Sequence, residues 1–114
     1  MHELAIVEAL LEQVGRVQEA HGGGRVSGTT VRVGKWRKVV PEVFRFHYDV
    51  LTRDGALSGS RLEIVEVDAT ALCASCGTLF AVEDSYIVCP ECSALGGSLV
   101  TGDELELVSV DLED

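Results

Sequence analysis

The 114-residue chain is poor in aromatic residues, and it has no Lys or Arg after Arg61. One Trp, two Tyr and three Phe leave a modest hydrophobic core, so a further source of stability is expected. No apolar run approaches the roughly 20 residues that span a bilayer, which excludes a helical membrane protein. The first residues lack the basic leader and the cleavage site of a secretory signal, so we expect a cytoplasmic protein without a membrane partner.

Charge is unevenly distributed along the chain. Nine Lys and Arg stand against nineteen Asp and Glu, and the formal net charge is −10. All nine basic residues lie within residues 16–61, and twelve acidic residues follow them. Because phosphate binding needs Lys and Arg, the sequence argues against a nucleic-acid partner. The acidity favours a cation or a basic protein surface, or it serves solubility alone.

Four cysteines form the most specific pattern in the sequence. They are arranged as two Cys-x-x-Cys pairs separated by twelve residues, and they are Cys73, Cys76, Cys89 and Cys92. Each pair can place two sulfurs on one ion, and four thiolates in a tetrahedron make a closed structural zinc site. We expect the segments 78–82 and 86–88 to form a hairpin that brings the second pair to the first. Such a site would supply the stability that the small core lacks.

Other uses of the four cysteines are less well supported. Disulfides are disfavoured in a cytosolic chain, whose thiols are kept reduced. A redox Cys-x-x-Cys normally occurs once, at the start of a helix, whereas here two pairs bracket a hairpin. Iron is also held by thiolates, so the ligand type alone leaves a rubredoxin-like electron carrier open.

The rest of the chain predicts two helices and three strands. An amphipathic helix is expected over residues 3–20, and strands are expected over 26–34, 62–67 and 104–112. Pro41 at a first helical position predicts a second helix over residues 41–52. The expected buried residues of the first helix are Leu4, Val7, Leu10, Leu11, Val14 and Val17, and those of the second are Val43, Phe44, Phe46, Val50 and Leu51.

These elements predict an α+β fold, with two helices on one face of a three-stranded sheet. The strands 62–67 and 104–112 are expected to pair with each other and with the first strand. The cysteines would form a zinc-ribbon-like module inserted between them. The expected domains are therefore 1–68 plus 104–114 for the α+β part, and 69–103 for the zinc part. Residues 35–40, which lie between the first strand and the second helix, are expected to form a basic loop. We hypothesise that this loop contacts an acidic partner surface.

The chain start carries a second metal-binding pattern. We expect Met1 to be retained, because aminopeptidases that remove it need a small second residue. The α-amine, the backbone nitrogen of His2 and its imidazole can then close fused chelate rings around Ni(II) or Cu(II). Glu3 is a candidate further ligand, although an acid in a first helical turn also has a plain structural role.

Taken together, the motifs resemble those of a known family. They are Met1-His2-Glu3, Val31-Arg-Val-Gly34, Pro41-Glu-Val-Phe-Arg-Phe, the two cysteine pairs and the closing stretch 102–112. In order and spacing they are similar to the hydrogenase nickel-incorporation proteins, the HypA/HybF family of nickel metallochaperones. The resemblance covers nearly the whole chain.

The resemblance implies a binding protein and not an enzyme. Such proteins deliver Ni(II) to the [NiFe]-hydrogenase large-subunit precursor, and in some bacteria they also assist urease. They work with a HypB-type GTPase, and both monomers and homodimers occur. The resemblance places transient nickel on Met1, His2 and Glu3, and structural zinc on the four cysteines. The alternative is a zinc-ribbon protein-interaction module without nickel transfer.

One departure from the family pattern lies before the second helix. Many members have an acid at the position of Val40, so a nickel or partner role of that acid is in question here. Glu42 lies nearby and is a candidate substitute. As an acid in a first helical turn, it also has a simple structural explanation.

Overall fold

The structure is a computed structural model that describes residues 3–83 and 86–113. Its elements run α1 (Glu3–Ala20), β1 (Val26–Gly34), the 3-10 turn η1 (Lys35–Arg37), α2 (Pro41–Leu51), β2 (Arg61–Val67), β3 (Thr70–Leu72), β4 (Leu79–Ala81), β5 (Ser98–Thr101) and β6 (Leu105–Leu112). They form two three-stranded sheets, in the orders β2-β1-β6 and β4-β3-β5. Among the described residues, neither helix is long and apolar enough to cross a membrane.

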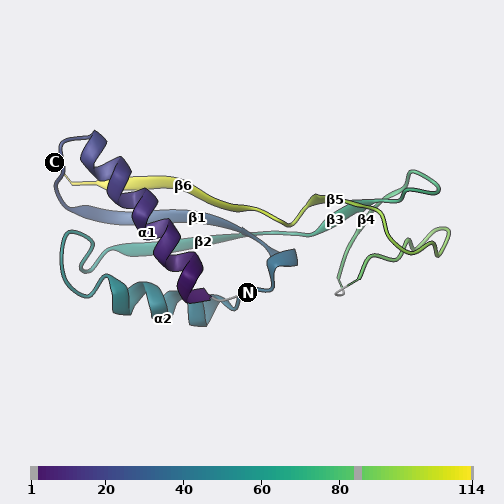
Figure 1. The fold of residues 1–114 in the computed structure, drawn as a ribbon, viewed down its shortest axis with the longest axis horizontal. Coiled ribbons are helices and arrows are strands. Elements are labelled where there is room, and N and C mark those ends of the chain that lie inside the picture. The colour runs from purple at the N-terminus through teal and green to yellow at the C-terminus, as the bar shows by residue number, and fades with distance from the viewer. Residues whose placement is uncertain (1–2, 84–85, 114) are drawn as a thin grey trace. The chain divides into compact units, whose positions relative to one another are not determined.

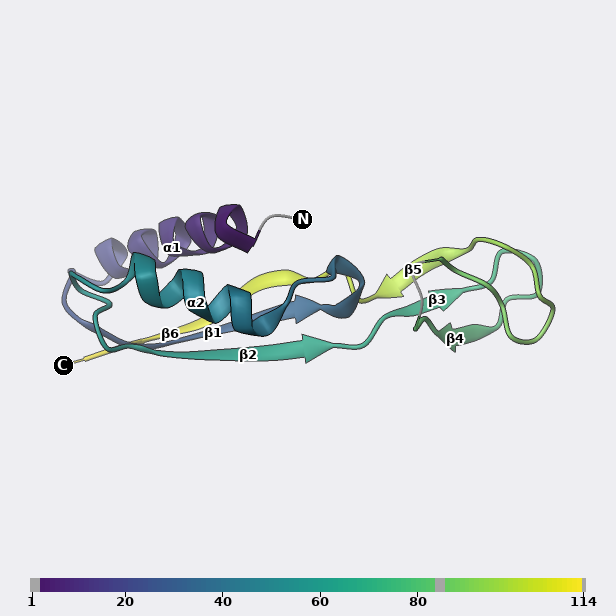
Figure 2. The same ribbon diagram turned by 90° about the horizontal axis from the view of Figure 1, so that it is seen from below.

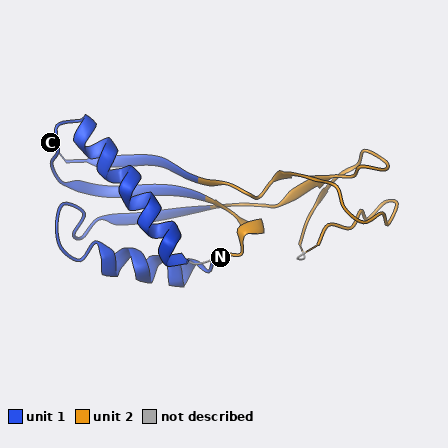
Figure 3. Cartoon of the chain, in the orientation of Figure 1, with its two compact units in different colours: residues 1–32, 39–65, 106–114 blue, residues 33–38, 66–105 orange. Residues whose placement is uncertain are grey.

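The chain divides into two compact units (Figure 3). Unit 1 comprises residues 1–32, 39–65 and 106–114, and unit 2 comprises residues 33–38 and 66–105. Unit 1 holds both helices, which cover the same face of the sheet β2-β1-β6 (Figures 1 and 2). The α+β prediction is confirmed. The three long strands differ in one respect: β1 is central, so β2 and β6 flank it and do not pair with each other.

Helix α1 has the predicted bounds, but its buried line is rotated. Ile6, Val7, Leu10 and Val14 are buried, whereas Leu4 is exposed. Three glycines follow the helix, and Gly22 adopts a positive φ of 88° that ends it.

Helix α2 begins at Pro41 as predicted, but most of its expected core residues are on the surface. Phe44 is fully buried, and Tyr48, four residues on, is buried in the same line. The Tyr48 hydroxyl donates to the Thr29 hydroxyl on β1, at 3.1 Å, which ties this line to the sheet. The other expected core residues are exposed, and they are Val43, Phe46, Val50 and Leu51. With 3.6 residues per turn, the residues 43, 46 and 50 form a separate line that points away from the sheet.

The cysteine region contains strands that the sequence did not reveal. The expected hairpin between residues 78–82 and 86–88 is wrong. Instead β4 pairs antiparallel with β3, a strand placed immediately before Cys73. Val88 forms an isolated bridge with Leu95, and β5 occupies a stretch for which no strand was predicted. The reason is local, because each cysteine pair closes its own tight turn and brings its own flanking residues together. The segment 35–40, expected as a loop, begins with the turn η1.

Candidate metal centre

Two short turns in unit 2 carry the cysteines, and both have the same backbone geometry. In each turn, the first cysteine's N–H donates to the carbonyl five residues later, and the N–H four residues later donates back to that cysteine. In the first turn, Cys73 donates to Thr78 and accepts from Gly77; in the second, Cys89 donates to Ala94 and accepts from Ser93. All four donor–acceptor distances are 2.9–3.0 Å. The fourth residue after the first cysteine has a positive φ in both turns, 75° at Gly77 and 63° at Ser93. The two turns thus form a structural repeat.

The repeated turns bring the four sulfurs together. All four Sγ atoms lie within 4.8 Å of one another, and the pairs Cys73–Cys92 and Cys76–Cys89 are each 3.6 Å apart. A tetrahedron of sulfurs at about 2.3 Å from a central ion has edges of about 3.8 Å. A disulfide requires about 2.05 Å, and all four cysteines are free. The spacing therefore fits four sulfurs on one ion.

Hydrogen-bond donors around the first turn stabilise negative sulfur. The backbone N–H groups of Cys76 and Ser75, at 3.5 and 3.4 Å from Sγ of Cys73, lower the pKa of that thiol to about 6. The hydroxyl of Thr78, whose Oγ1 lies 3.2 Å from Sγ of Cys76, lowers the pKa of the Cys76 thiol. The sequence alone gives no sign of the roles of Ser75 and Thr78, because neither is a residue type that usually binds a metal.

The neighbouring sulfurs favour the protonated form of the Cys92 thiol. The amide of Ala94 acts to lower the pKa of Cys92, but the Cys73 thiol, burial and the other sulfurs together raise that pKa to about 12. Like charges at this distance repel, so four thiolates require a cation among them. A divalent ion would supply it and would displace the remaining protons.

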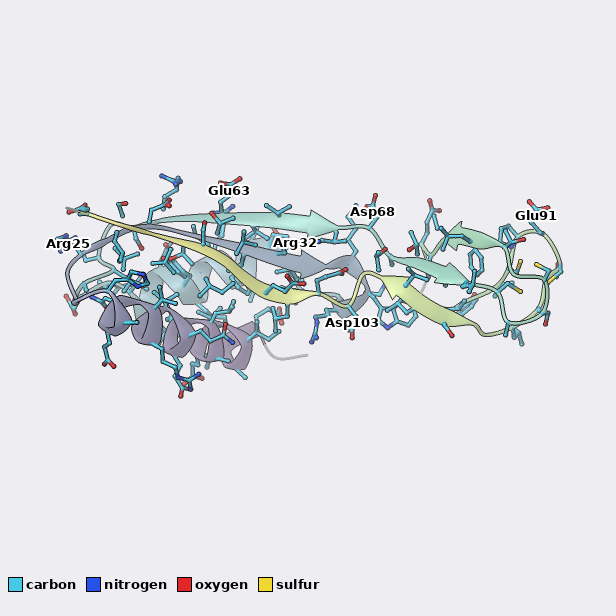
Figure 4. All side chains as sticks on the ribbon, turned by 90° about the horizontal axis from the view of Figure 1, so that it is seen from above. Arg25, Arg32, Glu63, Asp68, Glu91 and Asp103 are labelled. Carbon is cyan, nitrogen blue, oxygen red and sulfur yellow. The ribbon has the colours of Figure 1, made fainter. Side chains whose placement is uncertain are left out.

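The cluster is closed and half-buried. Cys73 and Cys89 are buried, while Cys76 and Cys92 are exposed. Four sulfurs around one ion would leave no open coordination position, as in structural metal sites. The sulfurs lie at the end of unit 2 that also carries Glu91 (Figure 4). The structure thus brings together the four predicted cysteines in an arrangement that could hold a metal ion.

The candidate nickel ligands are placed only in part. Met1 and His2 lie outside the described residues. Glu3 is half-buried and begins α1. Val40 immediately precedes α2, and Glu42 is exposed in its first turn, where the helix dipole favours an acid.

The basic segment at residues 35–38 is engaged within its own unit. The Lys35 ammonium lies 2.7 Å from the Asp68 carboxylate, and this hydrogen bond raises the pKa of Lys35. Arg37 donates to the backbone carbonyl of Asp103 at 2.8 Å and also pairs with its carboxylate. These contacts hold the turn η1 in place and leave less positive charge for the hypothesised acidic partner.

Known proteins resemble this chain over its full length. The family model described as "Hydrogenase/urease nickel incorporation, metallochaperone, hypA" matches residues 1–112. A protein of Geobacter metallireducens named hydrogenase maturation factor HypA is 35% identical over 113 residues, covering 99% of this chain and 100% of the relative. The protein of that name from Roseiflexus sp. is 37% identical, covering 100% of this chain and 94% of the relative.

Solved structures agree on the fold. The solution structure of the Ni metallochaperone HypA from Helicobacter pylori matches with a TM-score of 0.69 at 19% identity, covering 98% of this chain and 97% of that one. At this identity the likeness supports the fold alone, and the family rests on the sequence matches. On these matches and the shared motifs, the chain belongs to the HypA family of hydrogenase/urease nickel-incorporation metallochaperones.

Proposed function

We propose that this protein binds Ni(II) at its chain start and delivers it for the maturation of [NiFe]-hydrogenase, and in a suitable host also of urease. The observation that carries the proposal is the family match over residues 1–112, which includes both the Met-His-Glu start and the four cysteines. The protein would act by holding and releasing a metal cargo, in the cytoplasm, and not by catalysis. From this role in hydrogenase maturation we further propose that the partners of the protein are a HypB-type GTPase and the hydrogenase large-subunit precursor.

The nickel site we propose uses the amine of Met1, the backbone nitrogen and imidazole of His2, and Glu3. Nitrogen donors in one plane suit Ni(II), which prefers square-planar coordination with such ligands. The backbone nitrogen must lose its proton before it can bind, so nickel affinity should fall as the pH falls below neutral. Protonation of this backbone nitrogen would therefore release the nickel.

The second metal we propose is a structural zinc on Cys73, Cys76, Cys89 and Cys92. The sulfur spacing of 3.6 Å and the absence of an open position support zinc in a closed site. On this proposal the residues 69–103 form a zinc-binding domain, and the helices with their sheet form the nickel-binding domain. A homodimer is compatible with either metal site.

Nickel titration of the untagged protein with its native start tests the proposal. We expect one tight Ni(II) site that is lost in His2→Ala and in a protein with residues added before Met1. The matched control is His21→Ala, because the His21 ring nitrogen is already hydrogen-bonded to the carbonyl of Val17 at 2.9 Å. Elemental analysis before and after the titration should find one zinc throughout.

Three results would contradict parts of this proposal. Equal nickel affinity of His2→Ala and the unsubstituted protein would place the nickel elsewhere. A protein that holds zinc but takes up no nickel would instead be a zinc-ribbon interaction module. If the purified protein has the colour of thiolate-bound iron, iron and not zinc occupies the cysteine cluster.

A further inference from the structure

The small sheet of unit 2 has one buried face and one open face. Ala71 and Phe80, paired across β3 and β4, are buried against two of the cysteines. Because side chains alternate along a strand, the neighbouring Leu72 and Leu79 lie on the opposite face. They stand directly across from each other in the register and are 44% and 61% exposed. The end of the open face nearest the cysteines is therefore an apolar row.

A cleft continues this face away from the cysteines. Thr70 and Ala81 are the next pair along the open face, and both line a cleft of about 380 Å³. Trp36 and Val82 also line it, and both are half-buried. The cleft thus offers an aromatic ring and small side chains beside the leucine row, all within unit 2. A pocket next to an exposed apolar row is the usual arrangement for receiving an anchor side chain from another protein.

The charges of the unit indicate what can dock there. Residues 66–105 contain no Lys or Arg. With the zinc proposed above, four thiolates and one divalent ion add a net charge of about −2 at the cysteine end. At the cleft, Lys35 is paired with Asp68, and the lining also contains one further base, Lys38, and one further acid, Glu83, so the cleft itself is close to neutral. The cysteine end, which also carries Glu91, is therefore negative.

We infer that the open face of β4-β3-β5, with its cleft, is a docking surface for another protein whose contact patch is apolar and carries Lys or Arg opposite the cysteine end. A second copy of this chain would bring a like-charged cysteine end to the interface, which disfavours it. Nucleic acid and anionic lipid are disfavoured because their phosphates meet the same negative charge. The inference deepens the proposed function and rests on it for the choice of partners to test.

Substitutions at Leu79 test the surface without disturbing the core. Binding of the protein to the purified HypB-type GTPase and to the purified large-subunit precursor would be measured by calorimetry. We expect Leu79→Glu to weaken binding to one of them by about tenfold or more, as for a residue central to an interface. Leu79→Lys should weaken it further, because the new charge opposes a basic partner. Ala81→Phe, which fills the cleft, should also weaken it.

The matched control is Leu95→Glu, since Leu95 is an even more exposed leucine of the same unit, at 81%, and lies outside the sheet. Equal loss of binding in this control would overturn the assignment to the open face, as would unchanged binding in Leu79→Glu. A self-association of the unsubstituted protein that Leu79→Glu abolishes would make the face a contact between copies and overturn the inference. Zinc content confirms that each variant is folded. Nickel titration should be unchanged by Leu79→Glu, so failure here is separable from failure of the nickel proposal.

Discussion

Removing the metal from the cysteine cluster should unfold unit 2 and spare unit 1. The core of unit 2 is small: its buried residues include Ala71 and Phe80, and two further ones, Cys73 and Cys89, are themselves proposed zinc ligands. Structural zinc contributes roughly 10–16 kcal/mol to folding in small domains, as much as the whole stability of a typical domain, about 5–15 kcal/mol. Unit 2 should therefore have no net stability without the ion. Unit 1 has its own core, in which Phe44 is fully buried.

The two units carry separate spectroscopic signals. The single tryptophan, Trp36, is in unit 2, whereas both helices, of 18 and 11 residues, are in unit 1. A strong zinc chelator in reducing buffer should shift Trp36 fluorescence to the red while the circular dichroism at 222 nm is largely retained. Zinc addition should reverse the shift.

A ligand variant supplies the control for this experiment. Cys76 is exposed, so Cys76→Ser removes a ligand without opening the core. This variant should already show the red-shifted fluorescence, and chelator should change it no further. If the two signals instead change together at one chelator concentration, the units fold as one and the reasoning is refuted. Complete loss of zinc with unchanged Trp36 fluorescence would refute it equally.

Two further pairs of substitutions test the fold. Phe44→Ala should cost about 3–5 kcal/mol in urea unfolding followed at 222 nm, whereas Phe46→Ala should cost under about 1 kcal/mol, because Phe44 is 0% and Phe46 62% exposed. Equal costs would show that α2 is rotated from the orientation described. At the equivalent positive-φ positions of the two turns, Gly77→Ala should destabilise the zinc site by about 1–2 kcal/mol and Ser93→Gly should stabilise it slightly, since only glycine adopts this conformation without strain. The chelator concentration that removes half the zinc measures both, and a change of the same sign in the two variants would contradict the repeat.

Local patterns predicted those features that local interactions control. The apolar period of α1 and the glycines that follow it predicted both ends of this helix. Pro41, whose fixed φ suits a first helical turn, predicted the start of α2. The four cysteines could be grouped from their spacing, because a short turn always brings the two sulfurs of a Cys-x-x-Cys pair together. These features needed no knowledge of distant residues.

The order of amino acids alone was thus enough to predict the helices, the long strands, the cysteine cluster and the family pattern. Tertiary structure decided which face of α2 is buried, because Val43, Phe46 and Val50 are as apolar as Phe44 and only the position of the sheet distinguishes them. It also decided that β1 lies between β2 and β6. The pairing of these long strands depends on contacts between residues far apart in the chain. The strands β3 and β4 pair locally, but each has only three residues, which is too few to show a recognisable period.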